Sequence, residues 1–148
     1  MSFYREGKVF FDRQEFIYAF YVFYFILEGL FGKENREVEK NFKSSLELQE
    51  TIKGVLTKVM GIKNRHKNEI LNLLGQKNLQ YDVEGIIALL VRMRGHLHHF
   101  SRKSKLNQKS NPLAHQNYES LAVLTMAIAM QSILNEINKA KKSKIIII

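Results

Sequence analysis

Arginine and histidine gather in one short stretch, residues 92–101, which reads Arg-Met-Arg-Gly-His-Leu-His-His-Phe-Ser. Arginine stays cationic at any working pH, whereas histidine titrates near neutrality. Side chains of these two types can bind a phosphate group and move a proton beside it. Cleavage of RNA without a metal ion requires both actions, so the stretch predicts a site directed at phosphate.

Helix geometry divides this stretch into two faces. Each residue of a continuous helix advances by about 100°, so Arg94 and His98 lie nearly above one another, while His99 lies about 140° from Arg94. A second face carries His99 together with the small residues Ala88 and Gly95. Small side chains let another backbone approach closely, so this second face predicts an interface with another helix or a second chain.

Three histidines within four residues also suggest a metal site. His96 with His98 or His99 has a spacing that a helix can present to a divalent ion. No third ligand or carboxylate pair accompanies them in the sequence. We therefore expect neither a metal nor another cofactor, and we expect the isolated His66 and His115 to be solvated surface residues.

Positive charge is concentrated in the same part of the chain. The formal net charge is +9; residues 1–89 contain 13 Lys and Arg against 12 Asp and Glu, and residues 90–148 contain 10 against 2. A localised positive field favours a polyanionic partner, nucleic acid first and anionic lipid second. A solvated basic face is the alternative. The predicted loop 101–111 supplies four candidate RNA-binding residues, which are Arg102, Lys103, Lys105 and Lys109.

The composition predicts a single all-α domain. The chain has 148 residues, 45% hydrophobic and 25% charged, with one proline and no cysteine. Such a chain is long enough for one core, and the lack of cysteine fits a reducing, cytoplasmic setting. We expect an up-and-down bundle of four to five helices over residues 1–140, followed by a basic, isoleucine-rich tail at 141–148 that has no predicted packing partner.

Apolar spacing places the helices that position the Arg/His stretch. The expected helices cover residues 13–32, 37–60, 67–74, 80–100 and 111–137. The first has an apolar stripe spaced 4, 3, 4 and 3, formed by Phe16, Phe20, Phe23, Leu27 and Leu30. Residues 16–27 are the only candidate for a membrane or signal segment, but twelve residues are too few to span a bilayer. We therefore expect a central core helix and no membrane partner.

One acid interrupts this apolar helix. An unpaired carboxylate is costly to bury, so Glu28 must reach solvent or pair with a cation, for which Arg92 and Arg94 are the candidates. A structural ion pair is the favoured interpretation, and a catalytic role is the alternative.

The string 94–99, Arg-Gly-His-Leu-His-His, resembles the Arg-x4-His motif of the HEPN superfamily. It follows an apolar helix and precedes another helix, as in that family. The segment 25–31, Phe-Ile-Leu-Glu-Gly-Leu-Phe, is similar to the opening helix of its Apea-like branch. The resemblance implies a HEPN-like helical bundle that forms a homodimer, in which the Arg and His of both chains converge in one cleft.

By the same resemblance, the activity is that of a metal-independent endoribonuclease that leaves a 2',3'-cyclic phosphate. Arg94 would bind and polarise the scissile phosphate, and His99 would act as general base or acid. Supporting candidates are Arg92, His96, His98 and Glu28. Domains of this kind act in toxin, defence or RNA-processing systems, so an antitoxin or a larger defence-system protein is an expected partner. The alternatives are a non-catalytic HEPN-like module that binds RNA or protein, and a structural helical dimer that meets an acidic chain.

Overall fold

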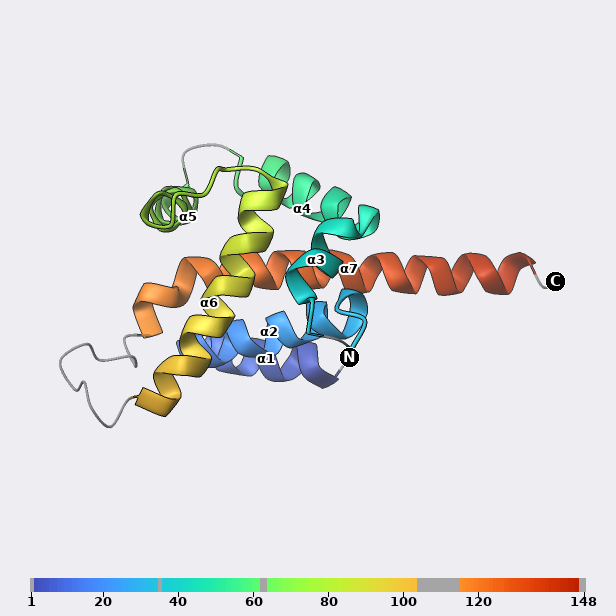
Figure 1. Ribbon diagram of the computed structural model, residues 1–148. Helices are drawn as coiled ribbons and strands as arrows, with labels where there is room; N and C mark the ends of the chain where they lie inside the picture. Colours follow the sequence, from blue (N-terminus) through green and yellow to red (C-terminus); the bar gives the residue numbers. More distant parts are fainter. Residues whose placement is uncertain (1, 35, 62–63, 104–114, 147–148) are drawn as a thin grey trace.

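The computed structural model describes residues 2–34, 36–61, 64–103 and 115–146, and within these it leaves out the side chains of 96–103 and 145–146. The described residues form an all-α structure with seven α-helices, one short 3-10 helix and no strand (Figure 1). The helices are α1 Ser2–Asp12, α2 Phe16–Phe31, α3 Val38–Ser44, α4 Leu46–Lys58, α5 Arg65–Gln76, α6 Val83–Lys103, η1 His115–Tyr118 and α7 Glu119–Ile146.

The all-α prediction is confirmed, but the described helices outnumber the four or five expected. Helix α1 was not anticipated, and the predicted helix 37–60 is divided at Ser45 into α3 and α4. Ser45 has extended backbone angles (φ −84°, ψ 108°), and its Oγ accepts a hydrogen bond from the backbone N–H of Leu48 at 3.2 Å. A serine that caps the second helix in this way ends the first, because an N-cap residue leaves the helical region.

Helix α2 forms the centre of the core, as predicted. Phe20, Phe23 and Leu27 are completely buried, whereas Leu30, the last residue of the predicted stripe, is 40% exposed. The helix packs against α1 on one side and α7 on another. Burial of three such side chains contributes about 1.5–3 kcal/mol each, so α2 is a main source of the fold's stability.

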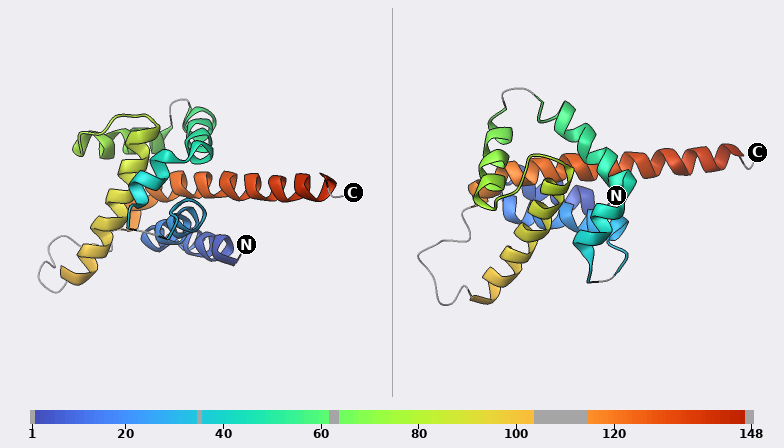
Figure 2. Two further views of the ribbon diagram at one scale, coloured as in Figure 1. Left: turned by 45° about the vertical axis from the view of Figure 1, so that its right-hand side comes forward. Right: turned by 45° about the horizontal axis from the view of Figure 1, so that its top comes forward.

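Helix α7 has a buried part and a projecting part. Leu121, Leu124 and Ile128 are completely buried, but residues 138–144 are exposed, and the helix extends well past the other elements (Figures 1 and 2). It continues unbroken through residue 140, so residues 141–146 lengthen the helix. By length and composition, 115–144 is apolar enough to cross a membrane, and 44% of its apolar window is buried in the protein. Residues 16–27 are therefore not the only apolar candidate, although core helices pass the same test.

Helix α6 lies across the bundle and contacts α2, α3, α4 and α5. Its first turn is fixed by Asp82, whose Oδ1 accepts a hydrogen bond from the N–H of Gly85 at 2.7 Å. Ile86, Leu90 and Met93 are buried, as the predicted stripe requires. The helix continues to Lys103, so residues 101–103 belong to it and not to the expected loop.

The two isolated histidines are not the solvated residues that were expected. His115 Nδ1 accepts a hydrogen bond from the N–H of Ile17 at 3.2 Å, in the first turn of α2. His66 Nδ1 lies 2.8 Å from Ser120 Oγ, which also hydrogen-bonds to Glu69. Both histidines are half-buried because they join helices distant in sequence, α2 to η1 and α5 to α7.

Candidate functional site

Arg94 lines an open cavity between α2, α3 and α6. The cavity has a volume of about 470 Å³, within the range of small-molecule sites. Its walls are Tyr24 and Glu28 of α2, residues 36–40 in the turn before α3 and in its first residues, and Val91, Arg94 and Gly95 of α6. The contacts of α6 with α2 and α3 bring these three segments together.

Ion pairing leaves part of the charge in this cavity unneutralised. Within the start of α3, Lys40 pairs with Glu37 at 3.6 Å, and Lys43 pairs with Glu39 at 3.3 Å. Among the described residues, Arg36, Arg94 and Glu28 form no ion pair. The cavity therefore presents two guanidinium groups and one carboxylate to an incoming ligand.

The expected ion pair between Glu28 and Arg92 or Arg94 is not formed. Glu28 and Arg94 line the same cavity, but no carboxylate–guanidinium distance between them is within 4.0 Å. Glu28 is half-buried near the end of α2 and reaches solvent through the cavity, so it avoids the cost of full burial without a partner. Arg92 is exposed on α6 and is not part of the cavity wall.

Two tyrosines of α2 respond to the charge of Arg94. Burial raises the pKa of Tyr24 above its ordinary value of 10; the charges of Glu28 and Glu39 also raise it, and Arg94 lowers it. Burial also raises the pKa of Tyr21, and Arg94 again opposes the shift. Both hydroxyl groups therefore stay protonated at neutral pH. Arg94 and Tyr24 also line the same cavity.

Most of the other predicted site residues fall on the end of α6. The helix carries His96, His98, His99, Arg102 and Lys103, whose side chains lie outside the described part of the structure. Lys105 and Lys109 lie outside the described residues altogether. Within the described residues, no group of three acidic or histidine side chains could hold a metal ion.

The two small residues of the predicted interface face have different surroundings. Ala88 is 2% exposed and packs inside its own chain, whereas a Cβ at Gly95 would meet no heavy atom within 4 Å. Only Gly95 therefore offers room for another chain.

Arg36 is the site residue that sequence reasoning missed. It stands in the turn between α2 and α3, at a position with no motif and no apolar periodicity to mark it. Only the packing of α3 on α6 brings it to the cavity of Arg94. Comparisons with family models, characterised proteins and solved structures gave no match to this chain.

Proposed function

We propose that this chain is a HEPN-like domain that cleaves RNA without a metal ion, with Arg94 as its phosphate-binding residue. The observation that supports this proposal best is that Arg94 and Arg36, which form no ion pair with a described residue, line the same cavity. Guanidinium groups bind phosphate oxygens through charge-assisted, often bidentate hydrogen bonds. A phosphodiester is the substrate group that suits such a pair.

The reaction we propose is attack of the ribose 2'-hydroxyl on the adjacent phosphorus. The bond from O2' to phosphorus forms, the bond from phosphorus to O5' breaks, and the products are a 2',3'-cyclic phosphate and a free 5'-hydroxyl. His99 takes the proton of the 2'-hydroxyl or supplies one to O5', and Arg94 stabilises the charge that develops on the phosphate oxygens. No metal is needed for these steps.

The proposal includes a homodimer because of the geometry of α6. The helix is continuous through Lys103, so the Cα–Cβ directions of Arg94 and His99 differ by about 140°. Two residues so arranged on one helix do not face a common phosphate, whereas Arg94 of one chain and His99 of a second can. We assign the domain to a cytoplasmic toxin, defence or RNA-processing system, as in the family it resembles.

The test uses the full chain and a fluorescent single-stranded RNA in EDTA. We expect cleavage with 2',3'-cyclic phosphate ends, lost at least 100-fold in His99→Ala and in Arg94→Ala, because general acid–base catalysis and a phosphate contact each contribute on this order. Arg36→Ala should weaken RNA binding. Arg5→Ala, an exposed arginine of α1 outside the cavity, is the matched control.

Two outcomes would contradict the proposal. One is full activity in both His99→Ala and Arg94→Ala, with unchanged circular dichroism. The other is RNA binding that falls steeply with salt but never shortens the RNA, which would assign the domain to the non-catalytic class.

A further inference from the structure

A second concave surface lies between α4 and α7, away from the Arg94 cavity. This α4/α7 groove has a volume of about 500 Å³. Its walls are Glu47, Glu50, Thr51, Gly54, Val55, Lys58 and Val59 of α4, and Ala127, Met130, Gln131 and Asn135 of α7. Gly54 leaves open space in the α4 wall, since a Cβ there would meet no heavy atom within 4 Å. Grooves between two helices are typical sites for a third helix.

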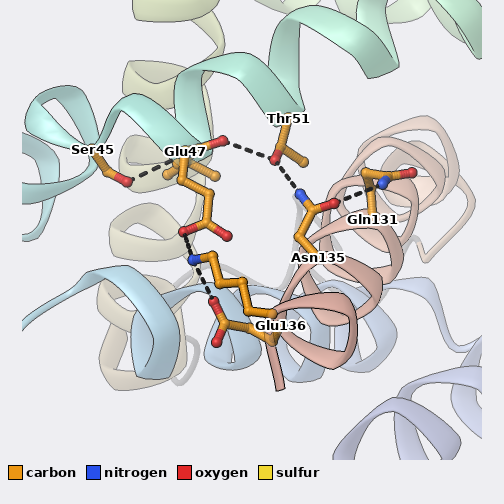
Figure 3. A network of polar contacts seen from close by, with 8 residues as sticks. Ser45, Glu47, Thr51, Gln131, Asn135 and Glu136 are labelled. Atoms are coloured by element: carbon orange, nitrogen blue, oxygen red, sulfur yellow. Dashed lines mark hydrogen bonds and ion pairs between the residues drawn. The ribbon is translucent and has the colours of Figure 1, made fainter. Parts of the chain in front are cut away.

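One end of the α4/α7 groove is polar and acidic (Figure 3). Asn135 Nδ2 donates to Thr51 Oγ1 at 3.2 Å, and Lys139 Nζ bridges Glu47 at 2.5 Å and Glu136 at 3.2 Å. Glu50 is exposed and forms no ion pair with a described residue. Two carboxylates thus share the single ammonium of Lys139, and Glu50 lines the same groove without an ion pair, so this end keeps a negative excess.

The other end of the groove has exposed apolar side chains beside Lys58. Val59 is 44% exposed and Met130 is 42% exposed. From Met130 the apolar row continues along α7 toward the polar end, on the flank of the groove, with Leu134, which is 44% exposed, and Ile137. These three residues are spaced 4 and 3 apart, which is the seam spacing of paired helices.

The projecting part of α7 carries the opposite pattern. Lys141, Lys142 and Lys144 are exposed and form no ion pair with a described residue, and α7 then continues with Ile145 and Ile146. Figures 1 and 2 show this part of α7 standing clear of every other helix. Lysines followed by isoleucines match, in antiparallel order, the acidic end of the groove followed by its apolar end.

We propose that the α4/α7 groove binds α7 of a second copy of this chain in antiparallel orientation. The lysines of one chain then lie beside Glu47, Glu50 and Glu136 of the other, and Ile145 and Ile146 lie toward the apolar end of the groove. If Met130 faces Ile146 of the second copy, residues 130–146 of the two helices overlap over about 24 Å, and two-fold symmetry places one such Met130–Ile146 pair at each end of the overlap. This pairing assigns a packing partner to residues 141–146.

This inference does not rest on the proposed ribonuclease activity. The α4/α7 groove and the Arg94 cavity share no residue. A chain that uses only the groove forms a dimer, and a chain that also pairs through α6 forms a larger assembly. The failure of one pairing therefore leaves the other intact and separately measurable.

The mass of the full chain in solution, from light scattering after gel filtration, tests the pairing. Wild type should show at least twice the 17.3 kDa of one chain, and Met130→Lys/Leu134→Lys should raise the dissociation constant of this contact at least tenfold. Leu71→Lys on α5 is the matched control, because Leu71 lies outside the groove and its exposed fraction, 40%, is similar to the 42% of Met130. It should keep the wild-type mass.

Charge reversal gives a second, independent readout. Glu50→Lys/Glu136→Lys and Lys141→Glu/Lys142→Glu/Lys144→Glu should each weaken the contact, and their combination in one chain should restore it. A monomeric wild type at tens of micromolar, or an unchanged mass in Met130→Lys/Leu134→Lys, would overturn the proposal. So would a monomer that sediments with phosphatidylserine vesicles, or lysine variants that lose RNA binding without a change of mass.

Discussion

Replacement of Gly7 by alanine tests how closely α1 approaches α2. A Cβ at Gly7 would lie 2.7–3.0 Å from three ring carbons of Phe23, which is completely buried. The ring is also held against Tyr4, with ring centroids 5.5 Å apart, so it has little room to move. Overpacking of this kind costs about 1–3 kcal/mol, whereas alanine in place of glycine within a helix gains about 1 kcal/mol.

Gly29→Ala is the matched control for this prediction. Gly29 lies on α2, and a Cβ there would meet nothing within 4 Å, so that variant receives the propensity gain alone. Both variants share this gain, so the difference between their free energies of unfolding isolates the steric cost. We expect Gly7→Ala to be less stable than Gly29→Ala by about 2 kcal/mol in urea titrations followed by circular dichroism.

A double-mutant cycle shows whether Phe23 is the cause. Phe23→Leu removes the two ring carbons closest to the new Cβ, so Gly7→Ala should cost clearly less in that background, with a coupling of about 1 kcal/mol. Equal stability of Gly7→Ala and Gly29→Ala, or no coupling to Phe23, would refute the close approach of α1 to α2.

Two further predictions concern the elements around the candidate site. A Cβ at Gly85 would lie 1.8 Å from the carbonyl oxygen of Gln80, and a backbone atom cannot move aside cheaply. Measured by thermal unfolding, Gly85→Ala should therefore lower the free energy of unfolding by about 3 kcal/mol or more. Gly75→Ala should not lower it, because a Cβ at Gly75 would meet no heavy atom within 4 Å. Tyr24 has a folded-state pKa raised above 10 by burial, so its contribution is complete below pH 10 and is lost as the pH rises further. The free energy of unfolding should fall as the pH rises above 10, and it should fall less in Tyr24→Phe; an equal fall in both would contradict the assignment.

The sequence predicts the helical class and the central helix because apolar spacing reports burial directly. Phe20, Phe23 and Leu27 are buried as their spacing requires. The break at Ser45 could not be predicted in the same way, since residues on both sides of it keep a helical pattern. A local hydrogen bond from the Leu48 amide to the Ser45 side chain decides it, and such bonds compete with helix propagation without altering the apolar pattern.

The candidate site was predictable only in part, for a related reason. Arg94 stands out in the sequence because arginine and histidine are dense around it. Arg36 has no such neighbours, and only the packing of α3 on α6 brings it to the same cavity. His66 and His115 were expected at the surface because an isolated histidine usually is exposed; their partners, Ser120 and the Ile17 amide, lie 54 and 98 positions away. Contacts at such separations leave no local sequence signal.

The hydrogen bond from the Ile17 amide to His115 has a consequence for the chain while it is being made. Helix α2 has no side-chain cap of its own, and α7 supplies much of the cover for its apolar surface. A ribosome releases α1 and α2 long before residue 115 is synthesised. For that interval α2 can pack on α1 but lacks the cover that α7 supplies, and exposed apolar surface of this kind promotes aggregation. Helix α7, near the end of the sequence, thus covers apolar surface of α2, near its beginning. Folding is complete only when these contacts of long sequence separation have formed.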